Sequence, residues 1–189
     1  GLIFILVCAM MTSVSIVREK EVGTMEVLLV SPVRPVKIVF AKMIPYFVIS
    51  FVILVMILLL SHYLLDVPMS GGVWGIFSLS LLYLLLSLSL GLLVSTIAKT
   101  QVAALLISAM VMMIPVLLLS GMIFPIENLP EIFQVLSTIV PARWYIDAIR
   151  KMMIQGVPLM AVWKNSTILL AMTIMFIVIS LKKFNDKLE

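Results

Sequence analysis

The feature that most constrains this sequence is the length of its uncharged stretches. Five long apolar stretches follow one another, at residues 1–17, 43–65, 73–98, 100–126 and 163–181, the last with one lysine near its start. A membrane-spanning helix needs about 18 to 20 mostly apolar residues, and each stretch is close to or above that length. The pattern therefore predicts five membrane-spanning helices.

The composition agrees with a chain buried in lipid. Hydrophobic residues make up 63% of it and charged residues 12%, whereas a typical soluble domain carries about a quarter of its residues as charged ones. No stretch alternates apolar and polar residues over segments of about ten, as a membrane β-barrel does. We predict an all-α polytopic membrane protein, in which the single cysteine, Cys8, forms no intrachain disulfide.

The distribution of lysine and arginine predicts the orientation, because the cytoplasmic side of a membrane protein carries the excess of these residues. Five crossings place nine of the thirteen on one side, namely Arg18, Lys20, Arg34, Lys37, Lys42, Lys99, Lys182, Lys183 and Lys187. We expect that side to be the cytoplasm. The C-terminus then lies inside, and residues 66–72 and 125–164 lie outside.

Residues 18–32 form a charged island between the first two stretches, and Pro32 ends it. If the island folds as a short helix, its apolar residues lie on one face and its acidic residues remain exposed to water. The apolar residues are Val22, Met25 and Leu29, and the acidic ones are Glu19, Glu21 and Glu26. One interpretation is an amphipathic connector on the lipid headgroups. The other is a docking helix for a soluble partner, which the carboxylates favour because anionic lipid repels them.

The island also resembles a known family. Its sequence from Arg18 to Val33, REKEVGTMEVLLVSPV, is similar to the coupling-helix signature of ABC transporter permeases of the ABC-2 type, and Lys42 matches the lysine that ends this signature. Ala41 departs from the glycine that the family often has at that place. Two later blocks, residues 120–130 and 141–150, resemble the external segment before the family's last span.

The resemblance implies the membrane subunit of an ATP-driven exporter for amphipathic or apolar substrates. It implies that ATP and Mg²⁺ lie on a separate P-loop nucleotide-binding subunit and that this chain binds no cofactor. The other partners would be a second permease subunit and the lipid bilayer, with no nucleic acid. The location would be the plasma membrane of a bacterium. Because the chain begins with Gly1 inside an apolar run, we expect a first span and an external domain to be missing, which makes these the second to sixth of six spans.

The resemblance also assigns roles to particular residues. Those expected to couple the chain to the ATPase subunit are Glu21, Val22, Gly23, Thr24, Met25, Glu26, Leu29 and Pro32. Those expected to form an external gate are Phe124, Pro125, Glu127, Pro141, Arg143 and Asp147.

Residues 127–156 are too charged to cross the bilayer and too apolar for a plain loop. A helix is predicted to start at Pro130 and to end at Pro141, and a second one to end at Gly156. The i,i+4 spacing predicts two ion pairs, Arg143 with Asp147 and Asp147 with Lys151. The resemblance implies a re-entrant hairpin, and two helices lying flat on the membrane surface are the alternative.

Two features stand out inside the spans. Pro115 interrupts one of them and is either a hinge or a tolerated kink. Another span is rich in small residues, which permit close helix packing, including packing at a dimer seam; these are Ser87, Ser89, Gly91 and Ser95. No Asp, Glu, Lys or Arg lies deep in a span, which disfavours a proton- or ion-coupled transporter.

Motifs for an enzyme are missing from this sequence. It contains no Gly-x-x-x-x-Gly-Lys-Ser/Thr, so it has no P-loop to bind the phosphates of ATP. It contains no Gly-x-Ser-x-Gly, so it lacks the turn that presents a catalytic serine in α/β-hydrolases. His62 has no second histidine and no nearby cysteine for a zinc site. We expect no enzyme activity from this chain. Two alternatives to the exporter remain: a non-transporting membrane anchor or sensor that recruits a cytosolic partner, and an enzyme completed by a missing part.

Overall fold

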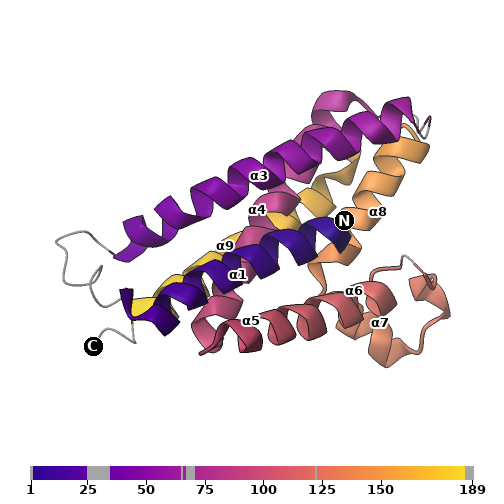
Figure 1. The fold of residues 1–189 in the computed structure, drawn as a ribbon. Coiled ribbons are helices and arrows are strands. Elements are labelled where there is room, and N and C mark those ends of the chain that lie inside the picture. Colours follow the sequence, from indigo (N-terminus) through magenta and orange to yellow (C-terminus); the bar gives the residue numbers. More distant parts are fainter. Residues whose placement is uncertain (1, 25–34, 65, 67–70, 122, 186–189) are drawn as a thin grey trace.

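A computed structural model describes residues 2–24, 35–64, 66, 71–121 and 123–185. The elements are almost all helices, arranged side by side along one common direction, with α7 and α8 at one end of the bundle (Figure 1). The α-helices are α1 (Leu2–Val22), α3 (Pro35–Tyr63), α4 (Val73–Ile97), α5 (Gln101–Ser108), α6 (Ile114–Leu119), α7 (Glu131–Ser137), α8 (Pro141–Ile154) and α9 (Trp163–Asn185).

Within these described residues, five helical segments are long and apolar enough to cross a membrane. They are Leu2–Val22, Phe40–Tyr63, Val73–Ile97, Gln101–Leu119 and Leu159–Lys183. The all-α fold with five membrane-spanning helices is therefore confirmed.

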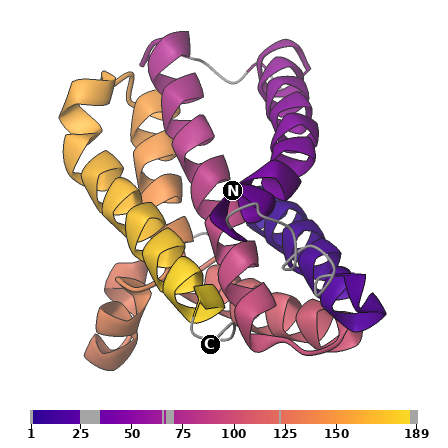
Figure 2. The same ribbon diagram turned by 90° about the vertical axis from the view of Figure 1, so that its left-hand side faces the viewer.

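Helix α4 is the centre of the bundle. Figure 2 shows it between α1 and α3 on one side and α8 and α9 on the other. Its small residues are all buried within this chain, and a methyl group at Gly91 would lie 2.6 Å from the carbonyl oxygen of Ala9 in α1. The predicted close helix packing is therefore confirmed at Gly91, where the partner is α1 of the same chain. Because these small residues are buried within this chain, they do not form an exposed dimer surface.

Helix α3 lies at the edge of the bundle and is the least buried of the membrane helices. Its exposed side chains are large and apolar, among them Ile44, Val48, Val52 and Met56. Exposing this apolar surface to water would cost free energy, whereas in a bilayer the same surface contacts the hydrocarbon chains of the lipids. A hydrogen bond from the Cys8 thiol to the Ser50 hydroxyl, at 2.9 Å, joins the buried middles of α1 and α3.

The first helix is longer than the sequence predicts. We expected a span at residues 1–17 and a separate coupling helix from residue 18, but α1 continues without a break to Val22. No proline or glycine stands in the way before Gly23, whose φ of +79° ends the helix in the left-handed conformation that glycine adopts at little cost. The four charged residues 18–21 and Val22 are therefore a direct extension of a membrane helix.

The fourth crossing is shorter than predicted and is not a uniform α-helix. It consists of α5, a π-helical segment at Ala109–Met113, and α6. The π segment ends two residues before Pro115. Proline has no N–H to continue the regular hydrogen-bond ladder, and its ring crowds the carbonyl four residues earlier, which here lies in the π segment. Helix α6 ends at Leu119 rather than continuing to residue 126, because Gly121 follows with a φ of +76°.

The two helices predicted between residues 127 and 156 are present. Helix α7 begins directly after Pro130, as expected, but it ends at Ser137, before Pro141. Pro141 instead begins α8, where its missing N–H costs nothing. Gly156, with a φ of +68°, lies just beyond the end of α8, as predicted.

We predict that Gly91→Ala destabilises the protein by about 1–3 kcal/mol, because the added methyl group meets the backbone of α1. Gly75→Ala, on the same helix, is the matched control, since its methyl group would come closest to side-chain atoms rather than backbone: the flexible end of Met152 at 2.7 Å and Leu159 Cβ at 3.2 Å. Thermal unfolding in detergent should show a lower midpoint for Gly91→Ala than for Gly75→Ala. Equal midpoints would contradict the close contact between α1 and α4.

Candidate functional site

The end of α1 forms an ion pair with the start of the second crossing. The Glu19 carboxylate contacts the Lys42 ammonium, and the two side chains are only 24% and 25% exposed. The second oxygen of Glu19, Oε2, is buried without a hydrogen-bond partner. Both residues belong to the motif of residues 18–42 that resembles the coupling signature, so the fold brings the start and the end of that motif together.

Two further contacts join the same end of α1 to α4 and α5. The Lys20 ammonium donates to the backbone carbonyl of Ser95. The Glu21 carboxylate accepts a hydrogen bond of 2.8 Å from the Gln101 side chain and one of 3.3 Å from the Gln101 backbone N–H. A carboxylate at the first turn of α5 also complements the positive end of that helix.

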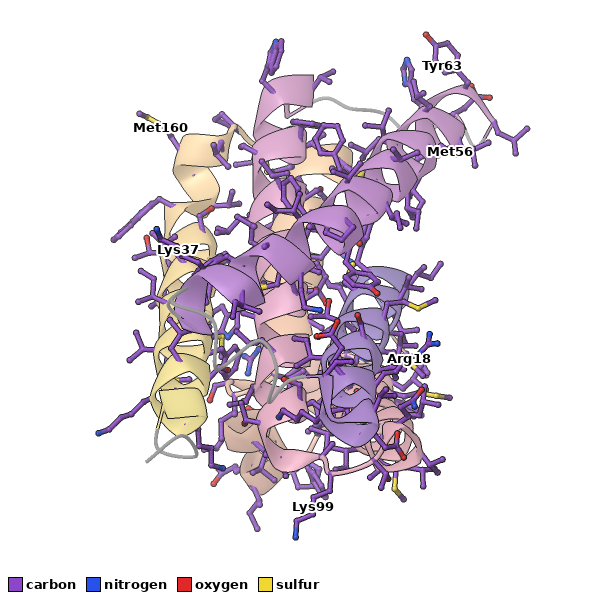
Figure 3. The ribbon with its side chains drawn as sticks, turned by 60° about the vertical axis from the view of Figure 1, so that its left-hand side comes forward. Arg18, Lys37, Met56, Tyr63, Lys99 and Met160 are labelled. Atoms are coloured by element: carbon purple, nitrogen blue, oxygen red, sulfur yellow. The ribbon has the colours of Figure 1, made fainter. Side chains whose placement is uncertain are left out.

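We call these residues the polar clamp: Glu19, Lys20, Glu21, Lys42, Ser95 and Gln101. The polar clamp ties the charged end of α1 to α3, α4 and α5 at once. Figure 3 shows Arg18 and Lys99 towards one end of the molecule and Tyr63 and Met160 towards the other. The polar clamp, which adjoins Arg18 and Lys99 in the sequence, therefore lies away from the end that carries Tyr63 and Met160.

The predicted coupling residues are only partly described by the structure. Glu21 is in the polar clamp, Gly23 ends α1, and Val22 and Thr24 are exposed beside them. The other four, Met25, Glu26, Leu29 and Pro32, lie outside the described residues. Sequence reasoning missed Gln101, because a single glutamine at the start of a helix carries no motif.

We predict that Glu19→Gln and Lys42→Met are strongly coupled in their effects on stability. Each single change leaves the other charge largely buried without its partner, so a double-mutant cycle should give a coupling energy of about 0.5–3 kcal/mol. The more exposed pair Asp147–Lys151, whose side chains are 44% and 43% exposed, is the comparison. It should give about 0.3–0.5 kcal/mol. If the two single changes have additive effects on the free energy of unfolding, Glu19 and Lys42 do not form a stabilising pair.

At the opposite end, Arg143 does not pair with Asp147 as predicted. Its guanidinium donates to the Gln134 carbonyl at 3.0 Å and to the Ser137 hydroxyl. Both acceptors lie in α7, whose last carbonyls have no partner within their own helix. Because Arg143 is in the first turn of α8, this end of α7 is within its reach, and the arginine fixes the angle between the two helices.

Asp147 binds Lys151, as predicted, and also α9. It accepts from Lys151 Nζ at 2.8 Å and from Asn165 Nδ2 at 2.9 Å, and Asn165 also donates to the Trp144 carbonyl. Partial burial by itself would raise the pKa of Asp147, but hydrogen bonds from Lys151 and Asn165 outweigh it and lower the pKa below its ordinary value. Asp147 is thus an ionised link between α8 and α9.

The predicted gate residues occupy different places in this segment. Phe124 and Pro125 are exposed, whereas Pro141 is buried at the start of α8. A small hollow of about 250 Å³ gathers the charged ones; it is lined by Ile126, Glu127, Gln134, Arg143, Trp144 and Asp147.

Helix α8 packs deeply against the central helix. The ring of Tyr145 stacks on that of Tyr83 with centroids 4.1 Å apart, and its hydroxyl lies 2.9 Å from the hydroxyl of Ser80. Tyr83 lies near the middle of α4, and both tyrosines are buried. The start of α8 therefore reaches the level of the middle of a membrane helix.

We predict that Asp147→Asn lowers the thermal unfolding midpoint at neutral pH. Because the folded-state pKa lies below the ordinary value of 3.8, the stability that this carboxylate contributes is present above that value and is lost as the pH falls through the folded-state pKa. The difference in unfolding midpoint between wild type and Asp147→Asn should therefore become smaller below pH 3.8. Glu131→Gln, which removes an exposed carboxylate at the start of α7, is the control and should lower the midpoint at neutral pH less than Asp147→Asn does. A constant difference at every pH would contradict the ionised link.

No group of three or more His, Cys, Asp or Glu side chains among the described residues is arranged to hold a metal ion. What the structure defines is a polytopic helical membrane domain with a polar clamp at one end and a helical hairpin, α7 and α8, at the other.

Comparison with known proteins identifies the family. A family model described as ABC-2 family transporter protein matches residues 1–182. The chain is 32% identical over 189 residues to the probable multidrug ABC transporter permease YbhS of Escherichia coli (strain K12), covering 100% of this chain and 50% of that protein. It is 31% identical over 178 residues to ABC transporter G family member 20 of Dictyostelium discoideum, covering 93% of this chain and 24% of that protein. No solved structure matches the chain significantly.

The chain therefore belongs to the ABC-2 family of transporter proteins. This confirms the resemblance recognised in residues 18–33 and in the two later blocks. The chain spans about half the length of the bacterial relatives that it matches. Its membrane-spanning helices are the transmembrane part of an ABC transporter.

Proposed function

We propose that this chain is part of the permease subunit of an exporter for amphipathic or apolar substrates, driven by ATP hydrolysis on a separate nucleotide-binding subunit. A second permease subunit would complete the translocation path. ATP and Mg²⁺ would bind to the nucleotide-binding partner, and the protein would lie in the inner membrane of a bacterium with its C-terminus in the cytoplasm. The observation that carries the proposal is the polar clamp.

The polar clamp offers a direct route from a soluble partner to the membrane helices. An ATPase subunit that pushes on the charged end of α1, at residues 18–22, moves a continuous membrane helix. Through Lys42 that movement reaches α3, and through Gln101 it reaches α5. Packed helices and hydrogen-bonded contacts move as units rather than deforming continuously, which is what coupling between two ends of a protein requires.

The fourth crossing is the element in which this movement produces a bend. Its π segment and Pro115 interrupt the regular hydrogen-bond ladder near the middle of the crossing, and interruptions of this kind are where membrane helices bend. Helix α6 then leads directly into the external segment that contains Phe124 and Glu127. In the proposed cycle, Pro115 is the hinge between the polar clamp and the external gate.

The depth of α8 supports a re-entrant hairpin rather than two helices lying flat on the membrane. Tyr145 contacts Tyr83 near the middle of α4, so a flat arrangement at the membrane surface would leave this contact unexplained. A hairpin at that depth closes the path from outside, and a small rotation of α7 and α8 would open it.

The sequence inside the spans supports apolar or amphipathic cargo. Residues 43–63, 73–97 and 101–119 contain no charged residue, so the interior offers neither an ion-coupling group nor a counter-charge for a strongly ionic substrate. The energy for transport then comes from outside the membrane part.

We predict that Val22→Arg and Met25→Arg uncouple ATP hydrolysis from export. The test uses the full-length protein with its co-purified ATPase partner in proteoliposomes, and measures ATP hydrolysis and substrate export together. Val22 is 66% exposed at the end of α1, and a new positive charge there should lower export per ATP by about tenfold, as expected for a lost contact of about 1.4 kcal/mol. Val102→Arg is the matched control, because Val102 is 65% exposed at the same end of the molecule, on α5.

Unchanged export in both island variants would refute the coupling role. If no ATPase co-purifies with a monodisperse protein, the anchor or sensor function replaces the exporter.

A further inference from the structure

An apolar cavity of about 340 Å³ lies beside Pro115. Its walls come from α1, α4, the fourth crossing, the corner between α7 and α8, and α9. The volume lies within the range of small-molecule sites, about 300–1,000 Å³. It is lined by Ile5, Leu90, Leu93, Val94, Ile97, Ile107, Val111, Met112, Pro115, Val116, Ile139, Val140, Pro141 and Phe176. None of these described residues has a charged side chain or a hydroxyl, amide or imidazole group.

This lining determines which chemistry the cavity can hold. An ion or a hydrogen-bonding group that moves into such surroundings loses its hydration and gains no partner, which is unfavourable. A hydrocarbon surface, in contrast, gains contacts with closely packed apolar atoms. Apolar cavities in proteins stay dry and bind small apolar molecules. The cavity therefore favours a compact uncharged ligand without a polar head.

The cavity is accessible from the lipid. Three of its lining residues, Ile97, Val111 and Ile139, are more than half exposed on the outer surface of the bundle. Val111 lies near the middle of the fourth crossing, which is long and apolar enough to span a membrane, so its exposed side faces hydrocarbon. A ligand that is already dissolved in the bilayer can enter beside this side chain without passing through water.

The cavity also joins two parts of the proposed transport path. One wall is the π segment with Pro115, and another is the start of α8 with Val140 and Pro141. A ligand in the cavity therefore contacts the proposed hinge and the proposed external gate at once. Because a movement of either wall changes the shape of the site, a ligand that binds one arrangement better shifts the population towards it. Functional sites are frequently found at π-helical turns inside α-helices.

We propose that this cavity is a lateral binding site for a compact uncharged hydrocarbon ligand that enters from the bilayer. The ligand lies between the π segment and the start of α8. This inference rests on the proposed function, for which it narrows the substrate class at this site from amphipathic or apolar compounds to uncharged apolar ones.

The first test maps where a compact apolar probe binds. The full-length protein in phosphatidylcholine nanodiscs is irradiated with azi-adamantane, an uncharged diazirine that loses N₂ and inserts into nearby bonds, and mass spectrometry identifies the labelled residues. Labelling of Met112 and Phe176, which line the cavity, should saturate with probe concentration. It should fall about tenfold when unlabelled adamantane is present at about ten times its dissociation constant.

The exposed residues Val48 and Val52 of α3 report on probe that is dissolved in the lipid. Their labelling should neither saturate nor fall when adamantane is added. If Met112 and Phe176 behave in the same way as these two, the cavity contains lipid chains or unbound probe, and the proposal is wrong.

Two pairs of variants test the position of the site. Val111→Trp fills the cavity from its exposed side and should weaken protection by adamantane about tenfold or more, the effect of excluding about two CH₂ groups. Met110→Trp is the matched control, because Met110 is 62% exposed against 58% for Val111 and does not line the cavity. Ile97→Trp and its control Val102→Trp, also at exposed positions, repeat the comparison in case one variant fails to fold. Equal protection in all four variants would refute the site.

The last test addresses charge. N,N,N-trimethyl-1-adamantylammonium has the same apolar body and a permanent positive charge. At equal concentration in the bilayer it should protect Met112 at least about a hundredfold less effectively than adamantane, because the cavity offers no counter-charge. Equal protection by the two compounds would overturn the uncharged ligand.

These measurements need no nucleotide and no partner subunit, so they can fail independently of the proposed function. Saturable, protected labelling of a protein with which no ATPase co-purifies would leave the site valid and refute the exporter alone. Unsaturable labelling of a protein that still exports with its ATPase partner would refute the site alone.

Discussion

The rest of the structure depends on the close approach of α1 to α4. In lipid the hydrophobic effect does not drive helices together, because the surroundings are as apolar as the helix surfaces. Association then requires that backbones come near enough for many weak contacts and short polar ones. Gly91, with no side chain, lets Ala9 of α1 lie directly against α4. A buried hydrogen bond between Ser13 of α1 and Ser108 at the end of α5 reinforces this packing at 3.1 Å.

The polar clamp follows from that contact. Once α1 is fixed against α4, its continuation beyond the apolar part brings three consecutive charged residues over the ends of three other helices. Lys20 then meets the last turn of α4, where carbonyl groups lack helical partners, and Glu21 meets the first turn of α5, where N–H groups lack them. These charged side chains, which water would solvate elsewhere, bind the ends of other helices. The charged end of α1 is therefore both the terminus of a membrane helix and a contact that holds helices together.

Much of the fold could be predicted from the sequence, and the failures have different causes. The number of spans, the start of α7 after Pro130 and the end of α8 before Gly156 follow from local chemistry. The continuation of α1 to Val22 is also local, because no proline or glycine precedes Gly23, but the resemblance favoured a separate helix. The role of Gln101 depends on Glu21, which is 80 residues away in the sequence. The small residues of α4 show the same limit: their number predicts close packing, but only the fold shows that the partner is α1. Family resemblance located the coupling motif, yet it did not indicate that Glu19 and Lys42 pair across it.

The fourth crossing connects the two ends of the molecule in physical terms. Its first residue, Gln101, is held by the end of α1, and its last turn leads into the segment that precedes α7. Between them, the π segment and Pro115 remove regular hydrogen bonds at the wall of an apolar cavity. A helix that is held at both ends and weakened in the middle concentrates any displacement at the weak point. In the proposed cycle, a movement of the polar clamp would therefore bend the fourth crossing at the π segment and Pro115 and change this wall of the cavity.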